Sequence, residues 1–136
     1  MRAIRVLGID HVALNVRNLQ ASMDFYTGIL GLRISEREHQ KPGVEHFLDC
    51  GSSLIGLIQG DLDGGNHGFR DGGFGANHFS IRVHTGQFDR IVSELKMRGV
   101  EVKFLKKRER SWSVYFEDPD GNKLEMTAWP IEDNKI

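Results

Sequence analysis

DHVALNV at residues 10–16 is matched by NHFSIRV at residues 77–83. Each stretch begins with an aspartate or asparagine followed by a histidine, and then places an apolar residue at every second position. Successive side chains of a strand face opposite sides, so a period of two predicts a strand with one buried face. Two such strands with the same opening predict an internally repeated chain.

The match continues into a helix after each strand. Residues 19–30 predict an amphipathic helix with Ser22 as its cap, and residues 88–97 predict a second helix with its apolar residues on one face. A glycine followed by an aliphatic residue ends each helix, at Gly31 and at Gly99, where glycine supplies a left-handed cap. Agreement over a strand, a helix and a cap supports a duplicated module.

Three further strand candidates complete each half. They are residues 33–38, 45–49 and 54–59 in the first half, and residues 102–105, 111–117 and 123–127 in the second. We therefore predict a single domain with an α+β fold, in which two βαβββ modules form a curved mixed β-sheet cup with helices outside. The modules span about 5–60 and 76–130, and a glycine-rich joint at about 60–75 connects them.

Composition favours one folded domain and gives no sign of a nucleic-acid or membrane partner. The 136 residues suffice for one domain, and 39% hydrophobic with 27% charged residues is typical of a globular protein. A net charge of −1 gives no indication of nucleic-acid binding, and no stretch reads as a signal peptide or membrane span. The single cysteine, Cys50, cannot form an internal disulfide. We expect a cytoplasmic protein.

Strand direction predicts that two histidines and a glutamate share one face of the sheet. The apolar positions of the first strand face the helices, so His11 faces the other side, and the same reasoning applies to His78. Glu125 lies between Leu124 and Met126 and also faces away from the helices. Two imidazoles and one carboxylate suit Fe, Zn, Mn or Ni and leave positions open for a substrate.

A structural role is the competing interpretation of these histidines. A single histidine at a strand start is more often a hydrogen-bonded structural residue, but two at equivalent positions of a repeat, with a carboxylate nearby, reduce the weight of that interpretation. Cys50 is interpreted as a small hydrophobic residue and not as a nucleophile. The remaining histidines are interpreted as loop or surface residues: His39, His46, His67 and His84.

Several motifs together resemble the vicinal oxygen chelate superfamily, also called the glyoxalase/bleomycin resistance/dioxygenase superfamily. They are the openings of both repeated strands, Phe25-Tyr26 with Leu30-Gly31-Leu32, and the run YFEDPDGNKLE at residues 115–125. The resemblance spans nearly the whole chain, and the last run is specific for the superfamily but not for one reaction. It implies that His11, His78 and Glu125 ligate one divalent metal, with Fe(II) or Mn(II) favoured over Zn or Ni.

The resemblance leaves the reaction open among three branches. Glyoxalase I has a fourth ligand where this chain has Gly56, which disfavours glyoxalase and epimerase chemistry. The three-ligand set resembles that of extradiol dioxygenases, ranked narrowly first, which need an apolar cup for a catecholate. Fosfomycin-resistance transferases and similar lyases follow closely. Bleomycin-resistance proteins, which sequester a ligand without a metal, are third.

Substrate contacts are predicted only from strand direction and position. The candidates are Asn15, Ser80, Arg82 and Tyr115, and no catalytic residue is assigned. A basic run within residues 103–110 is interpreted as a solvated loop, with phosphonate or carboxylate binding as the alternative. The resemblance implies a homodimer with a small-molecule substrate, and we expect no nucleic-acid or membrane partner.

Overall fold

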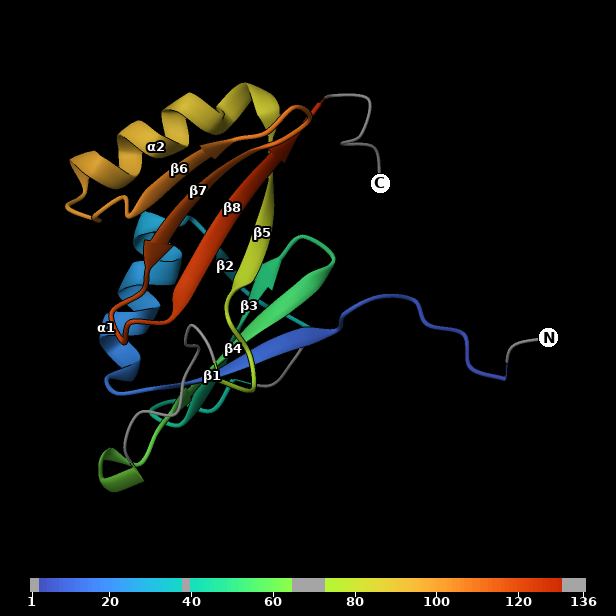
Figure 1. The fold of residues 1–136 in the computed structure, drawn as a ribbon. Coiled ribbons are helices and arrows are strands. Elements are labelled where there is room, and N and C mark those ends of the chain that lie inside the picture. The colour runs from blue at the N-terminus through green and yellow to red at the C-terminus, as the bar shows by residue number, and fades with distance from the viewer. Residues whose placement is uncertain (1–2, 38–39, 65–72, 131–136) are drawn as a thin grey trace. The chain divides into compact units, whose positions relative to one another are not determined.

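The computed structural model describes residues 3–37, 40–64 and 73–130. The chain divides into two compact units, residues 1–64 and 65–136, and each is described by itself. Each unit holds one four-stranded mixed sheet together with helical segments (Figure 1). Among the described residues, no helix has the length and apolar character needed to cross a bilayer.

The first unit has its strands in the spatial order β1-β4-β3-β2. β1 runs parallel to β4, and the other neighbours are antiparallel. Its elements are β1 (His11–Val16), α1 (Leu19–Met23), the π-helix η1 (Asp24–Ile29), β2 (Arg33–Ile34), β3 (Glu45–Cys50), β4 (Ser53–Gln59) and the 3₁₀ turn η2 (Leu62–Gly64).

The helix predicted at residues 19–30 consists of two consecutive segments, the α-helix α1 and the π-helix η1. Its cap is Asn18 and not Ser22: the Asn18 side chain accepts a 3.0 Å hydrogen bond from the Ala21 N–H, and Ser22 is fully buried inside the helix. From Asp24 onward the turns widen into η1. Both aromatic residues of η1 are buried in the core of this unit.

The second unit repeats this topology with the order β5-β8-β7-β6. β5 is parallel to β8, and the remaining pairs are antiparallel. Its elements are β5 (Phe79–His84), the 3₁₀ turn η3 (Thr85–Gln87), α2 (Phe88–Met97), β6 (Phe104–Lys107), β7 (Trp112–Glu117) and β8 (Lys123–Trp129). The predicted α+β class and the βαβββ order of both modules are confirmed.

Alternation along β8 separates a core face from a polar face. Leu124, Met126 and Ala128 are buried on the side that carries the helix, where the α2 residues Phe88 and Leu95 are also buried. Each large apolar side chain buried in this way, such as that of Leu124, contributes about 1.5–3 kcal/mol. The opposite side carries Glu125, Thr127 and Trp129, which line a cavity. One face of the sheet is therefore buried in the core, and the opposite face carries the polar groups.

Several strand boundaries differ from the prediction by one or two residues, and the end of β2 differs by four. β2 ends at Ile34, not at residue 38. The Ser35 N–H still donates to the Phe47 carbonyl at 2.9 Å, and beyond it the Gln40 side chain accepts from the Phe47 N–H at 3.0 Å and donates to the same carbonyl at 3.2 Å. β6 begins two residues later than predicted, at Phe104. The glycine caps are confirmed, with φ of 76° at Gly31 and 79° at Gly99.

Candidate functional site

In the second unit, His78 and Glu125 lie against each other at the edge of β5 and β8. His78 Nε2 is 2.9 Å from Glu125 Oε1. The Asn77 amide oxygen is 2.7 Å from His78 Nδ1, and because an amide oxygen only accepts, we assign the proton to Nδ1. In the neutral ring, Nε2 then turns a lone pair toward the carboxylate. Two acceptors this close repel each other unless a proton or a cation lies between them.

A divalent metal suits this pair. Two protein donors that each lie about 2.0–2.2 Å from one ion, at roughly a right angle, are about 3 Å apart. Neutral imidazole and carboxylate are also a donor set that Mn, Fe and Zn accept. Within the described residues, neither unit brings three His, Cys, Asp or Glu side chains together as a metal site. His78 and Glu125 therefore represent two of the three predicted ligands.

In the first unit, the His11 ring is oriented by a hydrogen bond at Nδ1, as the His78 ring is in the second unit. Asp10 Oδ2 lies 2.7 Å from His11 Nδ1, so a carboxylate replaces the Asn77 amide as the acceptor. The outer hydrogen bond again fixes the ring so that Nε2 remains available as a ligand. Each Asx–His pair found in the sequence is thus a histidine together with its orienting group.

Gly56 occupies the position in the first unit that Glu125 occupies in the second. Ala13 pairs with Gly56 in the β1–β4 register, as Ser80 pairs with Glu125 in the β5–β8 register. The Phe47 ring lies over Gly56, where an added Cβ would come within 2.9 Å of the ring. An aromatic ring thus fills the space that a fourth ligand would need.

Hydroxyl groups surround the Glu125 carboxylate. Thr127 Oγ1 donates to Glu125 Oε2 at 2.8 Å, and Ser80 Oγ lies 2.6 Å from Thr127 Oγ1. Because the Thr127 proton is directed at the carboxylate, Ser80 donates to Thr127. Burial raises the pKa of Glu125, but hydrogen bonds from neighbouring side chains, Ser113 and Thr127 first among them, outweigh it and hold the pKa below its ordinary value. The carboxylate is kept ionised, as a metal ligand requires.

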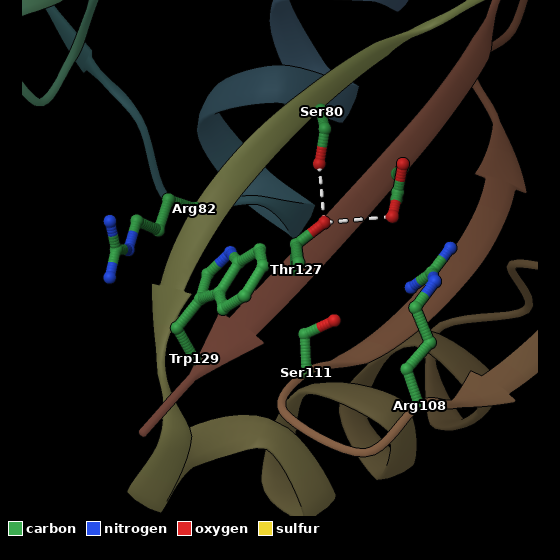
Figure 2. A pocket seen from close by; sticks show the side chains of 7 residues that line it. Ser80, Arg82, Arg108, Ser111, Thr127 and Trp129 are labelled. Atoms are coloured by element: carbon green, nitrogen blue, oxygen red, sulfur yellow. Dashed lines mark hydrogen bonds between the residues drawn. The ribbon is translucent and has the colours of Figure 1, made fainter. Parts of the chain in front are cut away.

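A cavity of about 450 Å³ opens beside this carboxylate in the second unit (Figure 2). Its described lining combines two cations, three hydroxyl groups, one carboxylate and one aromatic ring, from Arg82, Arg108, Ser80, Ser111, Thr127, Glu125 and Trp129. A space of this size takes a small molecule. The arginines make it attractive to anions.

Arg108 departs from the solvated-loop interpretation of the basic run. It follows β6, and its guanidinium donates to Ser113 Oγ at 2.9 Å and to the Tyr115 hydroxyl at 3.0 Å. Both partners lie on β7, on the face that holds Glu125. By contrast, the Lys107 ammonium group lies over the Trp112 ring, with Nζ 4.9 Å from the ring centroid. Adjacent residues of one basic run therefore have different roles.

Three of the four predicted substrate contacts lie at this cavity or beside it. Ser80 and Arg82 line it, and the Tyr115 ring packs edge-on against His78 with centroids 5.9 Å apart. Asn15 lies exposed on β1 of the first unit. Sequence reasoning missed Ser111 and Thr127, and it included Arg108 only within the basic run, where phosphonate or carboxylate binding was the alternative to a solvated loop. The period of two that singled out Glu125 also contains Thr127 and Trp129.

The other histidines within the described residues have structural contacts: His84 is exposed at the end of β5, in line with its interpretation as a surface residue, whereas His46 is half-buried on β3 and not in a loop. His46 Nδ1 pairs with Gln40 Oε1 at 3.0 Å, and His84 Nδ1 accepts from the Gly86 N–H at 3.1 Å. His39 and His67 lie outside the described residues. Cys50 is half-buried, and burial raises the pKa of its thiol. A thiol with a raised pKa is a poor nucleophile near neutral pH, as expected of a structural cysteine.

Comparison with known proteins identifies related chains. A sequence profile of the Glyoxalase/Bleomycin resistance protein/Dioxygenase superfamily matches residues 8–126. Glutathione transferase FosA of Serratia marcescens is 29% identical over 87% of this chain and 78% of its own. Metallothiol transferase FosB of Staphylococcus haemolyticus is 28% identical over 94% of this chain and 88% of its own. A glyoxalase/dioxygenase from Nostoc punctiforme has the same fold, with a TM-score of 0.77, 21% identity, and coverage of 96% and 99% of the two chains.

Proposed function

Since the chain belongs to the glyoxalase/bleomycin resistance protein/dioxygenase superfamily, we propose that it is a divalent-metal-dependent enzyme that joins a thiol to a small anionic electrophile of the fosfomycin type. This places thiol transfer ahead of the extradiol dioxygenase chemistry that the sequence ranked narrowly first. Two relatives named as thiol transferases favour the change of order.

The chemistry of the cavity is the observation that carries this proposal. A catecholate would need an apolar cup, but Trp129 is the only aromatic residue in the described lining. Arg108 and three hydroxyl groups lie there instead, next to the metal-ligand carboxylate. Guanidinium and hydroxyl donors are the groups that bind phosphonate or carboxylate oxygens.

We propose His11, His78 and Glu125 as the metal ligands. When bound, the ion supplies Lewis-acid polarisation of an oxygen of the electrophile. The chain itself prepares the ligands: Asp10 and Asn77 orient the two imidazoles, and the hydroxyl groups around Glu125 keep its carboxylate ionised.

The reaction itself balances without an oxidant or a reductant. The guanidinium of Arg108 holds the anionic group of the electrophile, which orients its reactive carbon. A bond forms between sulfur and this carbon while the carbon–oxygen bond breaks. The proton of the thiol ends on the released oxygen.

Adduct formation tests the proposal directly. Protein loaded with Mn(II) is incubated with fosfomycin and either glutathione or L-cysteine, and the adduct is measured by mass spectrometry. We expect an adduct with the summed mass of both substrates, and its loss in His78→Ala but not in His84→Ala, which removes only the hydrogen bond to Gly86. If the protein consumed oxygen with catechol and formed no adduct, extradiol dioxygenase chemistry would again be the favoured function. A wild-type protein that binds no divalent metal would instead be a ligand-sequestering member.

A further inference from the structure

An aromatic ring lies edge-on against each of the two histidines proposed as metal ligands. In the first unit, the centroids of the Phe47 and His11 rings are 5.7 Å apart and the rings meet at 87°. In the second unit, the centroids of the Tyr115 and His78 rings are 5.9 Å apart and the rings meet at 68°. Phe47 and Tyr115 both come from the third strand of their module, β3 and β7, so the two halves of the chain share this contact.

The strand registers place the two aromatic residues at equivalent positions. Phe47 pairs with Gly56 across β3 and β4, and Tyr115 pairs with Glu125 across β7 and β8. In the second unit, the carboxylate of Glu125 faces the histidine, with Oε1 2.9 Å from Nε2. Gly56 has no side chain to offer at this position. A tyrosine–glutamate pair in one half is therefore a phenylalanine–glycine pair in the other.

The Phe47 ring fills the space in front of Gly56. A Cβ built on Gly56 would lie 2.9 Å from Cε1 and 3.3 Å from Cδ1 of the ring. Carbon atoms that are not bonded to each other settle at about 3.5–4.0 Å, so the ring would have to move for any larger residue. A side chain at position 56 can therefore reach the His11 side of the sheet only by displacing Phe47.

Hydrogen bonds fix the backbone of Phe47, and its ring in turn restrains His11. The Phe47 N–H donates to Gln40 Oε1 at 3.0 Å, and the Phe47 carbonyl accepts from the Ser35 N–H at 2.9 Å. The His11 side chain is 45% exposed, and among the described residues its ring contacts Phe47 and the Asp10 carboxylate. The hydrogen bond fixes Nδ1, and the edge-on contact fixes the plane of the imidazole. Together they hold the lone pair of Nε2 in one direction.

We propose that Phe47 is a positioning residue for His11 and takes the place of a fourth protein ligand. Its ring orients the imidazole and excludes a side chain at position 56. The first unit then contributes one metal ligand where the second contributes two, which leaves a coordination position open to an oxygen of the substrate. This inference rests on the ligand role proposed above for His11, but it does not depend on thiol transfer.

The orienting role is tested with Phe47→Leu, which keeps an apolar side chain but removes the ring. In metal-free protein, the Hδ2 and Hε1 NMR signals of His11 should lose the shift caused by the Phe47 ring, while those of His78 stay in place. The Kd for Mn(II) should rise about three- to tenfold, the loss expected for one edge-on ring pair. Phe47→Tyr keeps the ring and should stay within about twofold of the wild type. A wild-type Kd in Phe47→Leu would overturn the orienting role.

The number of water molecules on bound Mn(II), measured by NMR relaxation of water oxygen, tests the exclusion of a fourth ligand. An octahedral ion with three protein ligands keeps about three waters. We expect about three in Gly56→Glu, where Phe47 keeps the new carboxylate away, and about two in Gly56→Glu combined with Phe47→Ala. Phe47→Ala alone should keep the wild-type number. So should Gly28→Glu, which adds the same charge where an added Cβ meets nothing within 4 Å.

The outcomes separate this proposal from the proposed reaction. A lower water number in Gly56→Glu alone, or a wild-type number in the double variant, would overturn the exclusion of a ligand by Phe47. If Gly56→Glu does not fold, Phe47→Ala and the double variant decide the matter, because both have room at position 56. Wild-type Mn(II) affinity in His11→Ala would overturn the ligand role of His11 and this inference with it. The expected water numbers in a protein without thiol transfer would retain the role of Phe47 and reject the reaction.

Discussion

Replacing Thr127 with valine removes the hydroxyl that orients Glu125 while keeping the branched shape that suits a strand. In the structure this hydroxyl donates to Glu125 Oε2 at 2.8 Å and accepts from Ser80 at 2.6 Å. Glu125 Oε1 faces His78, so Thr127 is the group that fixes the second carboxylate oxygen. We expect the variant to fold normally and to bind Mn(II) more weakly.

The size of the effect follows from these contacts. A hydrogen bond to a charged group contributes about 1.5–3 kcal/mol, and the lower end applies here because Thr127 is only half-buried and water replaces part of the loss. About 1.5 kcal/mol corresponds to a Kd for Mn(II) roughly tenfold higher. Losses of about 10–100-fold are usual when a partner that orients a metal ligand is removed.

Calorimetric titration of the metal-free protein with Mn(II) measures this Kd. Thr127→Ser keeps the hydroxyl and should stay within about threefold of the wild type. Thr27→Val is the matched control in the first unit, where it removes a 2.6 Å hydrogen bond to the Met23 carbonyl and should leave the Kd unchanged. If Thr127→Val binds Mn(II) within twofold of the wild type, the hydroxyl does not position the ligand and the argument is wrong.

Three further predictions concern stability and reactivity. Gly56→Ala should lower the free energy of unfolding by about 1–3 kcal/mol, measured by urea denaturation, because the new Cβ meets the Phe47 ring at 2.9 Å. Cys50→Ser should retain thiol-transfer activity, and wild-type Cys50 should react with iodoacetamide at pH 8 more slowly than free cysteine, because burial raises its pKa. Asp118→Ala should cost about 2–3 kcal/mol in the same denaturation assay, because the carboxylate accepts hydrogen bonds from the Asn122 backbone, the Asn122 side chain and the Asp120 backbone, all at 2.9 Å.

Controls separate these effects from general damage. Gly28→Ala, where an added Cβ meets nothing within 4 Å, should not destabilise the protein. Alkylation of Cys50 at the rate of free cysteine would contradict its burial. Wild-type stability in Gly56→Ala would show that the Phe47 ring moves aside at no cost. Unchanged stability in Asp118→Ala would mean that water satisfies the turn equally well.

The sequence alone determined the module order and most of the elements. Period-two alternation identified the strands that begin near His11 and His78, because the pleat directs alternate side chains to opposite faces. Glycines at positions 31 and 99 located the helix ends, because few other residues accept a left-handed conformation. The same alternation singled out Glu125, and the family resemblance located Gly56 at the position where glyoxalase I has a fourth ligand.

Local features that depend on side-chain competition were not predictable in this way. The π-helix η1 buries both of its aromatic residues, and next to β2 a side chain, that of Gln40, accepts the hydrogen bond from the Phe47 N–H. The residue types near the end of a helix or strand are compatible with several local conformations, and side-chain packing selects one of them.

Only the tertiary structure decided which polar groups meet. Periodicity fixes the face of a strand but not its register against a strand distant in sequence, and the β5–β8 and β7–β8 registers bring Ser80 and Tyr115 beside Glu125. The Arg108 side chain points toward the cavity because its guanidinium donates hydrogen bonds to the hydroxyl groups of Ser113 and Tyr115. A sequence shows which side chains are available, but hydrogen bonding and charge depend on distances that exist only once the sheet has formed.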